Sequence, residues 1–442
     1  MPLPPFRLDA EKRGNMEMDE TVKKKYIQIL KEELIPAEGC TEPIALAFCA
    51  AKAREVLAAS PDKMIVYASG NIIKNVKSVV VPNTNGKKGI ETAAVYGAVA
   101  GRPEEGLEVL RELKKGEAEE AERLLAIPGY VEVRHLSSDA KLHIIVEVFS
   151  GTERALVEIK DLHTNVVRIE KNGNLLLQKI DPSNKGAGDD GHGDFMTLKG
   201  ILEFAENIQL DELRPIIRRQ IEYNTRIADE GLAGNYGVNV GRTMLESYGN
   251  DIRMRCIAKA AAGSDARMSG VELPVVINSG SGNQGMTGSL PVIEYARHMG
   301  ISEDRLIRAL LISNLIAVYQ KAEIGRLSAY CGAVSAATAS VVGIAWLDSA
   351  SYEVMESIIK NALGNISGIV CDGAKPSCAA KIAISMQAAF MGYELAKRHR
   401  TFRGGDGIVK ESADQTVEAV GRMAHNGMVQ TDEEIIRIMI NE

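Results

Sequence analysis

The stretch LHIIVEVFSGTERALVEIK, residues 142–160, decides the fold of the first half of the chain. β-Branched and other apolar residues alternate or cluster on both sides of the turn at Ser150-Gly151, a pattern typical of a β-hairpin. Val131 to Val133 and Asn165 to Ile169 have the same texture, and Asn172-Gly173 marks a further turn. Together these segments predict an antiparallel meander.

Helical spacing dominates on both sides of this meander. Upstream, it predicts helices at residues 20–34, 42–59, 90–100 and 104–125, with short strands at 64–68 and 78–81. Downstream, residues 181–193 have the composition of a polar linker, and the pattern is almost wholly helical from Phe195 to the end.

We therefore predict an α+β fold with three parts. Residues 1–18 form a disordered or loosely docked extension. Residues 19–185 form an α+β domain with an antiparallel sheet and the helix that follows Cys40. Residues 195–442 form a large, mainly helical domain.

The composition excludes several classes of partner. The chain has 442 residues, 45% of them hydrophobic, which is enough to bury a large core. Its formal net charge is −7 and no basic cluster is interleaved with aromatic residues, so we expect no nucleic-acid partner. Residues 1–19 lack the apolar core of a signal peptide, and the small residues of 329–347 suit a buried helix better than a membrane span. We expect a cytoplasmic protein without a membrane partner, and a homodimer as one possible assembly.

The segment Glu38-Gly39-Cys40-Thr41-Glu42-Pro43 carries the first candidate for chemistry. Thr41 is expected to cap the helix, where free N–H groups and the helix dipole favour a thiolate at Cys40. Glu38 and Glu42 act in the opposite direction, so the pattern predicts a thiol that exchanges protons near neutral pH. The alternative is a small buried hydrophobe beside a cap, which is how we interpret Cys49.

A glycine-rich loop, Asn278-Ser279-Gly280-Ser281-Gly282-Asn283-Gln284-Gly285, follows an apolar run. Its glycines free the backbone to turn N–H groups inward, which favours binding of a carboxylate or phosphate. A flexible surface loop is the alternative. Asn83, in the polar turn after residues 78–81, either faces a substrate or belongs to a plain turn.

Three cysteines lie in glycine-containing turns, namely Cys331, Cys371 and Cys378. Because the chain is long and has no signal peptide, metal binding is a better explanation for such cysteines than a disulfide framework. Gly373 and Pro376 prevent a continuous helix between the last two, so both sulfurs can turn toward one point. Three thiolates suit zinc or iron–sulfur, or the residues are separately buried thiols. We expect Lys321 and Glu323 at the surface or at the margin of this site.

Four segments together resemble the L-cysteine desulfidase family, which is related to the α portion of the iron–sulfur L-serine dehydratases. They are Glu38 to Pro43, Ser279 to Gly285, Tyr330-Cys331-Gly332, and Cys371 with Cys378 in their Gly-Ala-Lys-Pro-Ser context. The resemblance covers the chain from about Asp19 to Glu442.

The resemblance implies that Cys331, Cys371 and Cys378 hold a [4Fe–4S] cluster in the helical domain. It also implies that an open iron binds the leaving group of the substrate and that Cys40 is the base. The substrate is then a small L-amino acid, with L-cysteine favoured, whose carboxylate lies against Ser279 to Gly285 and Asn83. A Ser-Ser-His-Thr type of segment, found in serine dehydratases, is absent from the sequence.

Three alternatives stay open. The first is an L-serine dehydratase or a lyase for another β-substituted amino acid. The second is a pyridoxal-phosphate enzyme, because Ser281 to Gly285 imitates a loop of those enzymes, although no Schiff-base lysine stands in a recognisable setting. The third is a non-catalytic amino-acid-binding or redox-sensing iron–sulfur protein.

Overall fold

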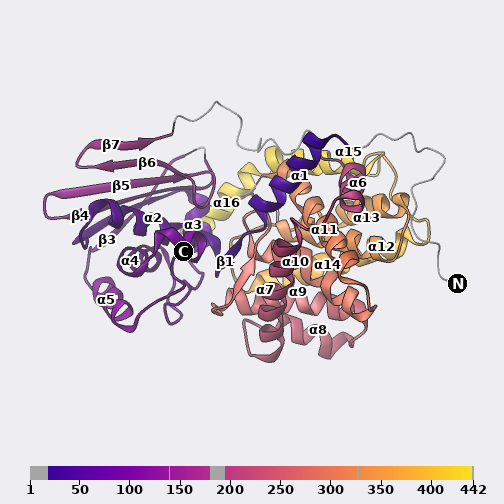
Figure 1. Ribbon diagram of the computed structural model, residues 1–442, viewed down its shortest axis with the longest axis horizontal. Helices are drawn as coiled ribbons and strands as arrows, with labels where there is room; N and C mark the ends of the chain where they lie inside the picture. Colours follow the sequence, from indigo (N-terminus) through magenta and orange to yellow (C-terminus); the bar gives the residue numbers. More distant parts are fainter. Residues whose placement is uncertain (1–17, 139, 180–194, 326–327, 441–442) are drawn as a thin grey trace.

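The computed structural model describes residues 18–138, 140–179, 195–325 and 328–440. The expected linker at 181–193 and all but the last residue of the expected extension lie outside these ranges. Figure 1 shows a sheet with helices beside it, formed by the first part of the chain, next to a larger group of helices.

The sheet has six strands in the order β3-β2-β4-β5-β6-β7. Their bounds are Lys63–Ala68 (β2), Val131–His135 (β3), His143–Ser150 (β4), Glu153–Lys160 (β5), Val166–Lys171 (β6) and Asn174–Gln178 (β7). Strands β4 to β7 form an antiparallel meander, as expected. The expected place of Val131 to Val133 in that meander was wrong, because β2 lies between β3 and β4 and pairs with β3 in parallel. The predicted antiparallel sheet is therefore confirmed, with one parallel edge pair added.

One face of this sheet is covered by helix α2 (Thr41–Leu57), which packs on β4 and β5. Val146 and Val157 face each other across these strands, and both are fully buried. Helix α4 (Ile90–Ala100) packs on α2 so closely that a Cβ at Gly97 would lie 2.3 Å from the carbonyl oxygen of Ala47. Small residues thus allow the tight helix packing beneath the site.

The second group has its own hydrophobic core, built by most of the later helices. They are α6 (Leu198–Asn207), α7 (Arg214–Ala233), α8 (Val240–Tyr248), α9 (Ile252–Met268), α10 (Gly282–His298), α11 (Glu303–Ile324), α12 (Gly332–Leu347), α13 (Tyr352–Ile366), α14 (Ser377–Ala396), α15 (Ala413–Arg422) and a short π-helix (Met423–Gly427), after which the chain continues as α16 (Val429–Ile440). Helix α1 (Glu20–Glu33) also contributes to this core, through Tyr26 and Ile29. Within the described part of the chain, no helix is both long enough and apolar enough to cross a bilayer.

Two local expectations were wrong. The expected helix at 104–125 is a short 3₁₀ segment (Pro103–Glu108) followed by α5 (Lys115–Leu125), because Gly106 has a φ of 56°, outside the helical region. The expected strand at 78–81 is reduced to a single bridge at Val80, and helix α3 (Gly70–Val76) precedes it.

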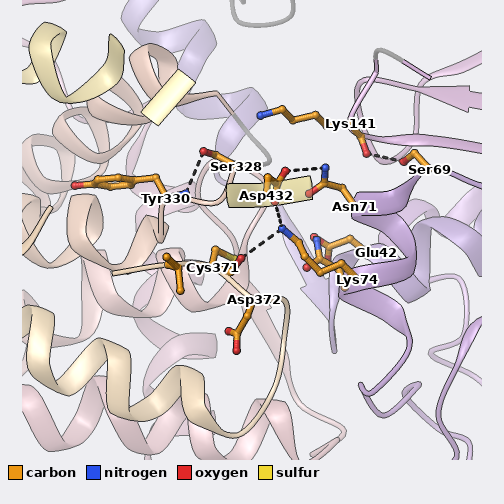
Figure 2. A network of polar contacts seen from close by, with 12 residues as sticks. Glu42, Ser69, Asn71, Lys74, Lys141, Ser328, Tyr330, Cys371, Asp372 and Asp432 are labelled. Atoms are coloured by element: carbon orange, nitrogen blue, oxygen red, sulfur yellow. Dashed lines mark hydrogen bonds and ion pairs between the residues drawn. The ribbon is translucent and has the colours of Figure 1, made fainter. Parts of the chain in front are cut away.

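The two groups of elements are joined at two places. Strand β1 (Pro36–Glu38) pairs with β8 (Pro274–Val276), just before Cys40 and the glycine-rich loop respectively. Helix α16 returns to pack on α3, as Figure 1 shows. There Lys74 Nζ lies 2.5 Å from the carboxylate of Asp432, with side chains only 1% and 8% exposed (Figure 2).

The Lys74–Asp432 pair generates a prediction about stability. Replacing Asp432 by Ala leaves a buried lysine without its partner, which costs about 3–5 kcal/mol for a buried pair. Glu434 on the same helix pairs with Arg437, but their side chains are 61% and 66% exposed, so Glu434→Gln is the matched control and costs about 0–1 kcal/mol. Denaturant unfolding measures both, and an Asp432→Ala loss no larger than that of the control would contradict the role of this pair.

Candidate functional site

Cys331 and Cys371 are brought together by a short antiparallel bridge between two loops. Tyr330 pairs with Val370, so that Cys331 N–H donates to Ile369 and Cys371 N–H donates to the carbonyl of Ala329. Since side chains alternate along extended segments, both cysteines lie on the opposite face from Tyr330. Forty residues of sequence thus separate two thiols that share one face of a two-stranded bridge.

Cys378 joins them because the segment after Cys371 curls back. Gly373 has a φ of +93°, a conformation that favours glycine, and its carbonyl lies 3.7 Å from Cys378 Sγ. Cys331 is the N-cap of α12, and Cys378 lies in the first turn of α14. Burial, followed by the neighbouring Cys371, raises the pKa of Cys331 to about 12, with Cys378 adding to the effect. The three thiols are therefore near enough to influence one another.

Lysine side chains surround these thiols. Lys321 on α11 is only 4% exposed. Burial lowers the pKa of its ammonium to about 8, although the nearby Cys371 and Cys331 act to raise it. Of the two positions expected for Lys321, the surface is wrong because α11 runs through the core, and the margin of the thiol site agrees with its interaction with Cys371 and Cys331. Lys381 on α14 donates to the carbonyl of Val370, beside the bridge. The charge of Lys321 and two helix N-termini thus favour an anionic group here, whereas Asp372 already forms an ion pair with Lys381.

Thiolates are the ligands that soft metals and iron–sulfur clusters prefer. Among the described residues, no group of three or more His, Cys, Asp or Glu side chains is arranged so as to hold a metal ion. A four-iron cluster binds each thiolate at a different iron. Cys331, Cys371 and Cys378 would hold it.

Cys40 is buried at the start of α2, where it is itself the N-cap in place of Thr41. Its Sγ donates to Glu42 Oε2 at 3.2 Å, while Asn75 donates to Glu42 Oε1 at 3.3 Å. Burial, followed by Glu42, raises the pKa of Cys40 well above its ordinary value, although Arg267 lowers it. The helix dipole stabilises a thiolate at Cys40 by only about 0.3–1 kcal/mol, which is less than the effect of burial. The expected proton exchange near neutral pH is therefore shifted toward the protonated thiol.

The glycine-rich loop lies against this cysteine. The Thr41 hydroxyl donates to the Gly280 carbonyl at 2.9 Å, and Ser279 and Gly280 both have positive φ. Ser281 caps α10 by accepting from Gln284 N–H. The Gln284 side chain reaches the backbone beside Cys331, because a Cβ at Gly332 would lie 2.4 Å from its amide carbon. The loop therefore lies between the Cys40 turn and the Cys331 turn.

Residues that the sequence did not single out also contact this loop. Buried amides fix its base, since Asn278 donates to Asn314, which also exchanges hydrogen bonds with Gln220. Arg267, at the end of α9, is 4% exposed and lies against the loop, because a Cβ at Gly282 would be 2.4 Å from its Nε. A lone arginine in a helix is ordinary in a sequence, and only the fold places this one beside Cys40.

The remaining candidates lie further from the thiols. Asn83 donates to the Leu110 carbonyl at 2.7 Å and also hydrogen-bonds to Glu38, so its amide already has protein partners and its substrate role stays a prediction. Cys49 and Cys256 are fully buried and donate to the carbonyls of Val157 and Pro291. Both pack in the hydrophobic cores, as expected for Cys49.

Comparison with known families decides the relationship. Residues 104–437 match the family described as serine dehydratase alpha chain. The chain belongs to the serine dehydratase alpha chain family. It is 52% identical over 421 residues to a UPF0597 protein of Lachnoclostridium phytofermentans, covering 95% of this chain and all of that one. A UPF0597 protein of Desulfitobacterium hafniense is 48% identical over 427 residues, covering 97% of this chain and 99% of its own length.

The resemblance drawn from the sequence is thus confirmed at the level of the serine dehydratase alpha chain family. Membership supports a lyase that acts on an amino acid in the manner of a dehydratase. The names of the relatives specify no substrate.

Gly373 provides a test of how the cysteine segment is held. A Cβ there would lie 2.5 Å from the Lys74 carbonyl in a backbone conformation unsuited to L-residues, so Gly373→Ala is expected to lower the free energy of unfolding by about 1–3 kcal/mol. Gly368 precedes the same bridge and has open space around it, so Gly368→Ala is the control. Equal unfolding midpoints for the two variants would show that the segment does not rest on α3.

Proposed function

We propose that the chain catalyses β-elimination from a small L-amino acid, most simply L-cysteine to sulfide, pyruvate and ammonia. The observation that carries the proposal is the convergence of three separate thiols with the Cys40 turn and the glycine-rich loop. Gly373 packs on the backbone of Lys74 and beside Asn75, and Asn75 binds Glu42, so the cysteine segment and the Cys40–Glu42 pair meet across α3.

A [4Fe–4S] cluster on Cys331, Cys371 and Cys378 would have one iron without a protein thiolate, which supplies a Lewis acid for the departing β-substituent. Lys321, which interacts electrostatically with Cys371 and Cys331, would offset the negative charge of such a group. Lys74 donates to the Cys371 carbonyl at 3.4 Å, so the ion pair with Asp432 also steadies this loop (Figure 2).

Cys40 and Glu42 form the base. Glu42 accepts the Cys40 proton along their hydrogen bond, and the thiolate so formed accepts the Cα proton of the substrate. Because burial raises the pKa of Cys40, its thiolate binds a proton strongly once it forms. Asn75 holds Oε1 of Glu42 in place for the transfer.

The glycine-rich loop would orient the two charged ends of an amino acid. Inward N–H groups at the start of α10 suit the carboxylate. Gln284 Oε1 is buried and has no hydrogen-bond partner among the described residues, so it can accept from the substrate ammonium. Ser279 and Gly280 set the turn that brings this helix end toward Cys40.

The overall reaction balances without an oxidant. Loss of the Cα proton to Cys40 and of the β-thiolate leaves 2-aminoacrylate, and the thiolate takes a proton to leave as sulfide. The enamine tautomerises to an imine, and water then releases ammonia and pyruvate. With L-serine the leaving group is hydroxide in place of sulfide, and the family description favours this second substrate. The cysteine branch rests on the missing Ser-Ser-His-Thr segment.

Replacing Cys40 tests the base directly. Cys40→Ala is expected to lower kcat by roughly 10²–10⁴-fold, the usual contribution of a positioned base. Iron content is expected to match that of the wild type, because Cys40 holds no metal in this scheme. Cys49→Ala, on the same helix, is the matched control and keeps activity. Unchanged product release by Cys40→Ala would show that another group removes the Cα proton.

Anaerobic reconstitution with iron and sulfide tests the proposal as a whole. We expect wild type to form pyruvate from L-cysteine faster than from L-serine, and Cys331→Ser, Cys371→Ser and Cys378→Ser each to lose iron, whereas Cys256→Ser retains it. A visible absorption bleached by dithionite supports the cluster, and a band removed by borohydride supports pyridoxal phosphate. Bound iron without turnover of either amino acid would favour the sensor alternative.

A further inference from the structure

Arg267 has fewer partners than a buried guanidinium requires. It is the penultimate residue of α9 and is 4% exposed. The one hydrogen bond of its side chain within the described part of the chain is from Nη1 to Asn283 Oδ1, a long contact of 3.4 Å, and the buried Nε has none. No carboxylate of the described residues forms an ion pair with it. A buried cation without an anionic partner is costly, so an anion is expected to complete this site.

The position of Arg267 indicates where that anion would lie. Its guanidinium packs against Gly282, the first residue of α10, where a Cβ would be 2.4 Å from Nε and 2.7 Å from Cζ. Helix α10 has 17 residues, so its N-terminus carries a substantial positive partial charge. The positive charge of the same guanidinium lowers the pKa of Cys40. An arginine, a helix N-terminus and the base thus surround one region.

We propose that Arg267 binds the α-carboxylate of the substrate, which restricts the protein to amino acids with a free carboxylate. The inference rests on the proposed function and adds the charge that the glycine-rich loop lacks. A guanidinium offers a planar fork of N–H donors that matches a carboxylate, and such charge-assisted bonds are the strong ones. Gln284, two residues into the same helix, leaves an acceptor for the ammonium, so the two ends of an amino acid have complementary groups.

Two simpler roles for Arg267 make different predictions. If it only lowers the pKa of Cys40, its loss would move the pH profile of kcat and leave carboxylate recognition intact. If it only packs against Gly282, its loss would lower stability and leave the ligand preference intact. Binding measured without turnover separates both roles from carboxylate recognition.

The test uses L-alanine and L-alaninamide as ligands for the anaerobically purified full-length protein, followed by calorimetry. L-Alanine has both charged ends and no β-leaving group, while L-alaninamide lacks the carboxylate charge. We expect wild type to prefer L-alanine. Arg267→Gln is expected to bind L-alanine about 10- to 100-fold more weakly and to lose the preference, in line with loss of a charged hydrogen bond. Arg267→Lys keeps the positive charge but lacks the planar fork of donors, so its affinity for L-alanine is expected to lie between those of wild type and Arg267→Gln.

Arg253→Gln is the matched control, since Arg253 lies on the same helix with its side chain about half exposed. It is expected to bind both ligands as wild type does. A wild type without preference for L-alanine overturns the inference, as does Arg267→Gln with the preference intact. Should Arg267→Gln fail to fold, Arg267→Lys with undiminished affinity for L-alanine overturns it. Carboxylate-dependent binding without pyruvate formation would instead refute the proposed function and leave the inference standing.

Discussion

The bridge between Tyr330 and Val370 is the constraint on which the site depends. Two backbone hydrogen bonds, at Cys331 and Cys371, align loops from distant parts of the sequence and turn both thiols to one face. The positive φ of Gly373 then brings Cys378 back to the same side. Without that bridge the helices α12 and α14 would still pack on each other. The cysteines at their N-termini, however, would not be held at one place.

Charge in this region follows from how the two halves of the molecule meet. Helix α16 brings Asp432 to Lys74, which leaves Lys321 as the buried cation facing the thiols. On the other side, β1 and β8 bring the Cys40 turn to the glycine-rich loop, and α9 adds Arg267. Burial is the largest influence on Cys40 and on Lys321, since it raises the pKa of the thiol and lowers the pKa of the ammonium. Each group is therefore less charged by itself than it would be next to a bound group of opposite charge.

The sequence predicted those parts of the structure that depend on local pattern. Alternation in residues 142–160 was sufficient for the meander, and the three cysteines and the glycine-rich loop stood out by their turns. It failed where one residue changes the backbone, as at Gly106, and where tertiary packing decides exposure, as at Lys321. Arg267 and the amides of Asn314 and Gln220 had no local signature, because their roles arise from contacts between helices far apart in the chain.

The central claim is that three cysteines leave one iron of a cluster open beside the Cys40–Glu42 pair. Mössbauer spectroscopy of protein reconstituted with ⁵⁷Fe, before and after L-cysteine is added to Cys40→Ala, tests it most directly, since that variant is expected to bind substrate without turnover. The account predicts that one iron in four changes its isomer shift and the other three do not. Four irons that respond alike, or a protein that binds no cluster, would contradict it.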